Sequence, residues 1–159
     1  CIPVYPKFYL STHENASLPQ AAISVNESMP IRAVEQLKRS FGNDVAKKRV
    51  AILGAAYRGG VKETAFSGVF SLVTQIANNG WDPLVHDPLY NDTELIELGF
   101  QPFALGESCD AAIIQTDHEV YKEITSKDLP DAQYLYDGRR ILSQNQIKPI
   151  TLLQLGSGQ

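Results

Sequence analysis

Residues 49 to 70 decide the fold class of this chain, because three kinds of segment follow one another there. Val50-Ala51-Ile52-Leu53 has the length and apolar character of a buried strand. A turn over residues 54–60 carries glycine at 54, 59 and 60, and the segment from Val61 onward favours a helix. A buried strand that passes through a tight turn into a helix is the opening unit of an α/β fold with a parallel sheet.

The turn at residues 54–60 is a candidate phosphate site. In open α/β sheets, ligands bind beyond the carboxyl ends of the strands, where backbone N–H groups and a helix N-terminus face them. We therefore expect this turn to present its N–H groups to a ligand, with Arg58 as an added cation. The spacing is neither the dinucleotide fingerprint, since Ala56 takes the place of its second glycine, nor a P-loop. A tight turn without a ligand remains the alternative.

The chain after residue 44 alternates between the patterns of strands and helices. Strands are predicted at 49–53, 82–86, 111–115, 134–136 and 151–153; helices are predicted at 63–79, 92–98 and 118–123, with a turn at 124–129. Repeated strand-helix units joined by right-handed crossovers form a mainly parallel sheet that is covered on both faces. The predicted fold class is therefore α/β, a Rossmann-like doubly wound sheet.

The N-terminal part is predicted to be a helical arm. Apolar residues recur at intervals of three to four over residues 18–41, the period of a helix with one buried face. Pro30 lies inside this pattern and should kink or split the helix near Met29, because proline removes a backbone donor. A shorter helical turn is expected at 8–13, and the cluster 40–44 marks the boundary after the arm.

The composition limits the classes of partner. With 159 residues, 43% hydrophobic content and a net charge of -4, the chain fits one domain and an appendage, without the basic character of a nucleic-acid-binding protein. No apolar run approaches the ~20 residues needed to span a bilayer. Two cysteines are too few for a disulfide framework and lack metal-ligand spacing, so we expect no metal and a cytoplasmic location.

Several polar residues follow the predicted strands. Asp87 either accepts hydrogen bonds from ribose hydroxyls or ends its strand in an Asp-Pro turn, and Thr116-Asp117 is expected to cap the helix at 118–123. Arg139 lies at the same predicted sheet edge as Arg58, so a phosphate contact and a purely structural role both stay open for it. Cys109 is expected to be a buried small hydrophobe.

Six stretches together resemble one family, the UDP-glucose/GDP-mannose dehydrogenases, which use NAD to oxidise C6 of a nucleotide sugar to a carboxylate. The stretches are Cys1-Ile2-Pro3-Val4-Tyr5-Pro6 with Phe8-Tyr9-Leu10, Asn26-Glu27-Ser28-Met29-Pro30, residues 50–67, Asp87-Pro88, Asp117-His118 and Asp137-Gly138-Arg139. The resemblance covers nearly the whole chain. It is the order of the stretches that makes the combination specific, because each one alone is short.

The resemblance implies an organisation and a set of roles. Residues 1–41 correspond to part of the central helical segment, which begins at the catalytic cysteine and forms a homodimer through the helix at 18–41, and residues 42–159 to the C-terminal UDP-sugar-binding domain. The NAD-binding domain would precede Cys1. By resemblance, Cys1 is the nucleophile that carries the C6 carbon as a thioester, while Tyr57, Arg58 and Arg139 contact the UDP sugar.

The sequence departs from the family pattern at three positions. Tyr5 stands where the family often has Asp, Ala65 replaces an arginine that reaches toward the cofactor pyrophosphate, and Gly68 replaces a proline. The start of the chain is more like members that act on UDP-N-acetylhexosamines than on UDP-glucose. We expect these 159 residues alone to bind a nucleotide sugar without oxidising it. The alternative is a non-catalytic α/β dimerisation or interaction module.

Overall fold

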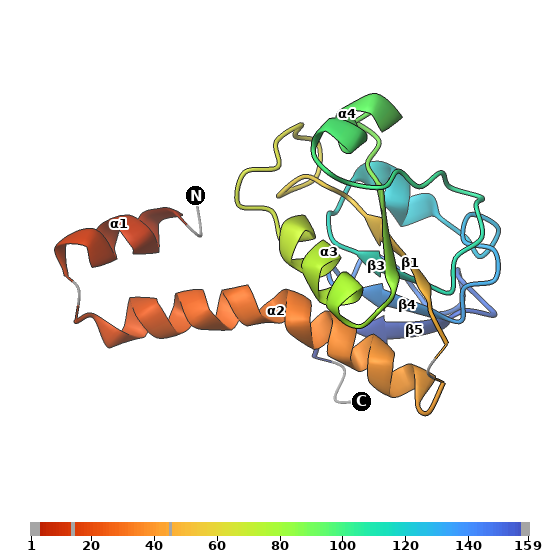
Figure 1. Cartoon of the computed structure of the whole chain (residues 1–159), viewed down its shortest axis with the longest axis horizontal. Helices are drawn as coiled ribbons and strands as arrows, with labels where there is room; N and C mark the ends of the chain where they lie inside the picture. The colour runs from red at the N-terminus through yellow and green to blue at the C-terminus, as the bar shows by residue number, and fades with distance from the viewer. Residues whose placement is uncertain (1–3, 14, 45, 157–159) are drawn as a thin grey trace.

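A five-stranded parallel sheet forms the centre of the protein, in a computed structural model that describes residues 4–13, 15–44 and 46–156 (Figure 1). The strand order is β2-β1-β3-β4-β5, and every neighbouring pair is parallel. The strands are β1 (Arg49–Leu53), β2 (Asp82–His86), β3 (Ala111–Ile114), β4 (Tyr134–Asp137) and β5 (Thr151–Gln154). The predicted α/β class and doubly wound parallel sheet are confirmed.

The inner strands are apolar on both faces because both faces of the sheet are covered. All four residues of β3 are buried, as are Val50 to Leu53 of β1. One face packs against α2 (Ser17–Phe41) and α3 (Val69–Asn78) through Leu37, Leu72 and Ile76. The opposite face packs against the 3₁₀ helix η1 (Glu119–Glu123) and the segments around it, with Tyr121 and Ile147 fully buried.

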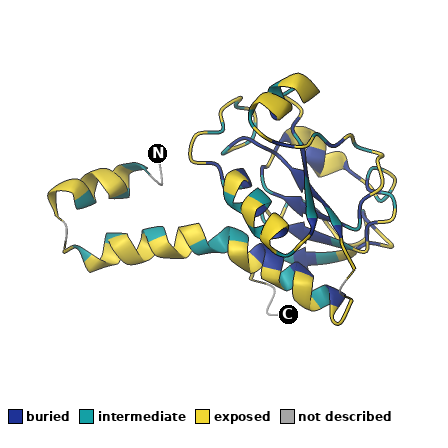
Figure 2. Ribbon diagram, in the orientation of Figure 1, coloured by how far each residue is buried: buried dark blue, intermediate teal, exposed yellow. Residues whose placement is uncertain are grey.

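The long helix α2 is continuous across Pro30, so of the two outcomes predicted near Met29, a kink or a split, the split is wrong. Proline removes only one helical hydrogen bond, and the turns on either side keep theirs. The last three turns pack on the sheet, where Phe41 meets Trp81 and Tyr134 edge to face. The first half projects beyond the sheet and is exposed, with α1 (Val4–Thr12) folded back beside it (Figures 1 and 2).

The helix α3 begins at Val69, six residues after the start of the helix that the sequence predicts at 63–79. The prediction is therefore wrong at its beginning. The carbonyl of Glu63 accepts a hydrogen bond from the N–H of Tyr57 across the turn, and Phe66 has a positive φ of 60°. Both features are incompatible with a regular helix. Residues 61–68 therefore form a loop, and the N-terminus of α3 does not directly follow the turn.

The remaining predicted elements are found within a few residues of their expected bounds. The helix α4 (Asp92–Glu97) begins with a capping box in which Asn91 and Glu94 exchange side-chain to backbone hydrogen bonds. Among the described helices, none is long and apolar enough to cross a membrane.

Candidate functional site

Three turns meet at the carboxyl edge of the sheet. The register pairs Leu53, the last residue of β1, with Ile114 of β3, and Ile114 with Asp137 of β4. The turns that follow these residues, at 54–60, 115–118 and 138–140, are therefore neighbours. Two glycines allow them to touch: a Cβ atom on Gly54 would collide with the side chain of Thr116, and one on Gly59 with the backbone of Asp117. Gly54 also has a φ of 105°, which favours glycine.

A buried carboxylate holds the first half of the β1 turn. Asp87, directly after β2, is 2% exposed, and its Oδ2 accepts hydrogen bonds from the N–H groups of Ala55 at 2.8 Å and Ala56 at 3.1 Å. Its Oδ1 accepts from the N–H of Leu89 at 2.9 Å. Both carboxylate oxygens of Asp87 thus accept hydrogen bonds from the protein itself. Of the two roles considered for Asp87, the turn that ends the strand therefore agrees with the structure, and the contact with ribose hydroxyls does not.

The loop after β3 holds the second half of the same turn. The N–H of Gly59 donates to Oδ1 of Asp117 at 2.9 Å, and the N–H of Gly60 donates to Nδ1 of His118 at 3.3 Å. The Nε2 of His118 lies 3.2 Å from Oδ2 of Asp87, so the residue that holds the first half of the turn contacts one that holds the second half. The hydroxyl of Thr116 donates to the carbonyl of Ala56 at 2.6 Å.

These bonds overturn two expectations. The glycine turn does not present a row of N–H groups to a ligand, because those of residues 54, 55, 56, 57, 59 and 60 already have protein acceptors. Thr116 and Asp117 also do not cap the following helix: η1 begins after His118 without a side-chain cap. The side chains that would cap it are engaged by the β1 turn instead. Sequence reasoning missed this network, although each member follows the carboxyl end of a predicted strand.

Electrostatics at the edge favour an ionised Asp117. The hydrogen bond from Gly59 lowers the pKa of this carboxyl group, and the nearby charge of Arg139 lowers it further. The pKa of His86, by contrast, is lowered by burial, and its Nδ1 lies 2.9 Å from the hydroxyl of Tyr121. Burial also raises the pKa of Tyr121, so this phenol stays protonated.

The cations predicted to contact a substrate lie in the first and last of the three turns. The exposed guanidinium group of Arg58 is 5.8 Å from the ring centre of Tyr57. The Nε of Arg139 donates to the carbonyl of Gln115 at 2.7 Å, and its backbone N–H donates to Asp137. Within the described residues, neither Nη atom of Arg139 has a hydrogen-bond or ion-pair partner. Asp117, bonded to the turn of Arg58 and near Arg139, links the two.

The two cysteines differ in what the structure says of them. Cys1 lies outside the described residues. Cys109 is buried, as predicted, and burial raises the pKa of its thiol to about 12. A thiol with such a pKa is protonated at neutral pH and is a poor nucleophile.

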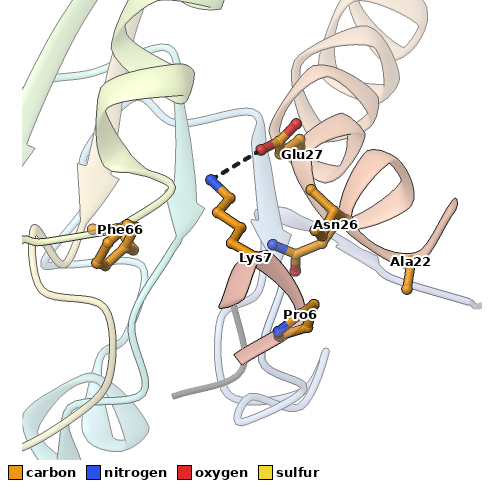
Figure 3. Close-up of a pocket in the computed structure, with 8 residues that line it drawn as sticks. Pro6, Lys7, Ala22, Asn26, Glu27 and Phe66 are labelled. Atoms are coloured by element: carbon orange, nitrogen blue, oxygen red, sulfur yellow. Dashed lines mark ion pairs between the residues drawn. The ribbon is translucent and has the colours of Figure 1, made fainter. Parts of the chain in front are cut away.

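A cavity of about 200 Å³ lies between the helical arm and the loop at 61–68 (Figure 3). Its polar walls come from α1 and α2: Nζ of Lys7 is 3.6 Å from a carboxylate oxygen of Glu27, and the side chain of Asn26 lies beside them. On the opposite wall, the ring of Phe66 has its centre 5.8 Å from the same Nζ. No group of three or more potential metal ligands occurs in the described parts of the chain.

Comparison with known proteins agrees with this architecture. The model of the UDP-glucose/GDP-mannose dehydrogenase family, UDP binding domain, matches residues 51–144, more than half of the chain and all three turns. The chain belongs to this family. The family and the fold are thus both those expected from the sequence.

Relatives of known name cover nearly the whole chain. A UDP-N-acetyl-D-mannosamine dehydrogenase of Methanocaldococcus jannaschii is 29% identical over 92% of this chain and 34% of its own length, and a UDP-glucose 6-dehydrogenase of Haloferax volcanii is 29% identical over 81% and 31%. The solved structure of a UDP-D-ManNAc dehydrogenase from Pyrococcus horikoshii superposes with a TM-score of 0.76 at 25% identity, over 99% of this chain and 38% of that one. The chain thus spans about a third of the length of these relatives.

Proposed function

We propose that this chain is the UDP-sugar-binding part of an NAD-dependent nucleotide-sugar 6-dehydrogenase. The observation that carries the proposal is the position of two arginines, Arg58 and Arg139, in the turns on either side of the β3 turn, at the carboxyl edge of a UDP binding domain. A protein with a net charge of -4 needs local cations to hold a diphosphate, and guanidinium groups match phosphate oxygens in pairs.

The diphosphate would be held by side chains. The N–H groups of residues 55, 56, 59 and 60 in the β1 turn are occupied by Asp87, Asp117 and His118, so they cannot form the usual cradle for phosphates. Arg139 is suited to the role because its Nε donates to the carbonyl of Gln115, while its Nη atoms have no partner among the described residues. Tyr57, half-buried under Arg58, would pack against the sugar or the base.

The same arrangement does not fit a dinucleotide. The pyrophosphate of NAD needs free N–H groups at the glycine turn and a helix that starts there, whereas α3 begins only at Val69. We propose that NAD binds to another part of the intact protein and that Cys1 supplies the nucleophile for the sugar carbon. The reaction would take place in the cytoplasm.

The arm formed by residues 1–41 is proposed to form the homodimer. The first half of α2 projects from the sheet with Leu18 and Val25 exposed, which leaves apolar side chains for a second copy. The division between this arm and the UDP-binding domain of residues 42–159 is part of the proposal. A polypeptide of these 159 residues alone is proposed to bind UDP sugars without oxidising them.

Calorimetric titration with UDP-glucose tests the proposal. The wild-type chain should bind, and Arg58→Ala and Arg139→Ala should each weaken binding about tenfold to a hundredfold, the effect of one charge-assisted hydrogen bond. Arg32→Ala, on an exposed turn of α2, is the control and should bind like the wild type. Equal affinity of all four proteins would refute the proposed site.

The exposed half of α2 also favours a second candidate, a non-catalytic dimerisation module. Sedimentation distinguishes the two when it is combined with the titration. Dimers that have no measurable affinity for UDP-glucose would support the module and exclude the nucleotide-binding proposal.

A further inference from the structure

The imidazole of His118 is buried between the carboxylate of Asp87 and the backbone N–H of Gly60. Its side chain is 3% exposed, with Nε2 at 3.2 Å from Oδ2 of Asp87 and Nδ1 at 3.3 Å from the N–H of Gly60. A carboxylate only accepts hydrogen bonds and a backbone N–H only donates. The contacts therefore require the neutral imidazole with its proton on Nε2.

This tautomer joins both halves of the turn that carries Arg58. Upstream, Asp87 binds the N–H groups of Ala55 and Ala56; downstream, His118 and Asp117 bind those of Gly60 and Gly59. Arg58 lies between the two pairs, so its backbone position depends on both. A second proton on His118 would place an N–H at Nδ1 against the N–H of Gly60, and the hydrogen bond between them would be lost.

We propose that His118 is a positioning residue for Arg58: the neutral imidazole holds the β1 turn in its binding conformation, and protonation of His118 releases Gly60 and weakens the UDP-sugar site. The predicted effect on UDP-sugar binding rests on the proposed function. The hydrogen bonds of His118 to Asp87 and Gly60, which we call the latch, are a property of this chain alone.

The groups that face the imidazole come from three elements. Asp87 and His86 lie at the end of β2, Tyr121 lies in η1 with its ring centre 5.6 Å away, and Asp117 precedes His118 in its own loop. Tyr121 remains neutral because burial raises its pKa.

Nuclear magnetic resonance tests the latch without a ligand. In ¹⁵N-labelled protein near neutral pH, the ring nitrogens of His118 should show the tautomer protonated on Nε2. The amide signal of Gly60 should then shift with pH along the same titration curve as His118. The opposite tautomer, or a Gly60 amide that stays fixed while His118 titrates, would overturn the proposal.

Calorimetry tests the consequence for the ligand, with UDP-glucose as the probe because its phosphates are diesters and stay ionised between about pH 5 and about pH 8. Affinity of the wild type should fall about threefold to tenfold as His118 is protonated, the value of roughly one hydrogen bond. His118→Gln keeps one donor and one acceptor but does not titrate, so it should bind without this pH dependence.

Two controls separate the possible causes. His13→Gln removes an exposed histidine at the end of α1 and should keep the wild-type profile. A pH dependence that persists in His118→Gln and disappears in His86→Asn would assign the effect to His86 and overturn the proposal. If the wild type binds no UDP-glucose at any pH, the proposed function fails, and the resonance experiment still decides whether the latch exists.

Discussion

Replacement of Asp87 by asparagine should destabilise the whole sheet edge. The carboxylate is buried and accepts four hydrogen bonds, three at Oδ2 from Ala55, Ala56 and His118, and one at Oδ1 from Leu89. Asparagine has the same shape and volume, so the substitution changes only the charge and one acceptor. Its effect therefore reports on the network and leaves packing unchanged.

The magnitude follows from the four bonds. If the amide oxygen of the asparagine takes the place of Oδ2, its NH₂ group faces the N–H of Leu89, and a buried donor without an acceptor costs about 1–3 kcal/mol. The other three bonds change from charge-assisted to neutral, each weaker by roughly 0.5–1 kcal/mol. The free energy of unfolding should thus fall by about 3–6 kcal/mol, a large share of the ~5–15 kcal/mol typical of a domain.

Urea denaturation followed by circular dichroism measures this change. Asp82→Asn is the matched control, because Asp82 begins the same strand, has a side chain that is 39% exposed and, among the described residues, forms an ion pair only with Lys47, at 2.8 Å. The control should lose less than about 1 kcal/mol. A loss for Asp87→Asn no larger than that of the control would refute the view that this carboxylate anchors the turn.

Three further predictions concern single positions. Gly54→Ala should lower the free energy of unfolding, measured by urea denaturation, by about 2–5 kcal/mol, because φ of Gly54 is 105° and Thr116 occupies the space of a Cβ atom. Gly80→Ala is the control, with φ of 75° and open space, and should cost about 1–2 kcal/mol. Equal costs would contradict the close contact of the turns. Because the pKa of Asp117 is lowered in the folded state, its contribution to stability is present above about pH 4 and is lost as pH falls through that lowered pKa. The difference in urea midpoint between the wild type and Asp117→Asn should therefore shrink in acid. A difference that is independent of pH would contradict the hydrogen bond to Gly59. In a Cys1→Ser background, Cys109, whose pKa is raised to about 12, should react with a thiol reagent at pH 8 only as fast as the protein unfolds, and rapid reaction of the native protein would show that it is not buried.

The sheet could be predicted from the sequence because each strand is a short apolar run with a turn signal after it. The runs at Arg49–Leu53 and Asp82–His86 have the same bounds in the structure, and the others differ by one residue at their ends. In the inner strands β1 and β3, residues 50–53 and 111–114 are all buried, so their apolar runs are unbroken and end at a glycine or a polar residue.

The details of the turn could not be predicted, because they depend on contacts between distant residues. The helical pattern over residues 63–68 is overridden by the bond between Tyr57 and Glu63, and the capping pattern of Thr116-Asp117 by bonds to Ala56 and Gly59. Local propensity is weaker than such tertiary hydrogen bonds. The edge on which Arg58 and Arg139 lie follows from the parallel sheet, and that part was open to prediction.

The most direct test of the account is a map of backbone amide shifts on addition of UDP-glucose to the ¹⁵N-labelled chain. The account predicts that the shifts concentrate in the three turns at the carboxyl edge, residues 54–60, 115–118 and 138–140, with the opposite edge around Gly80 and Gln133 unchanged. Shifts centred on that opposite edge, or a spectrum that UDP-glucose leaves unchanged, would contradict it.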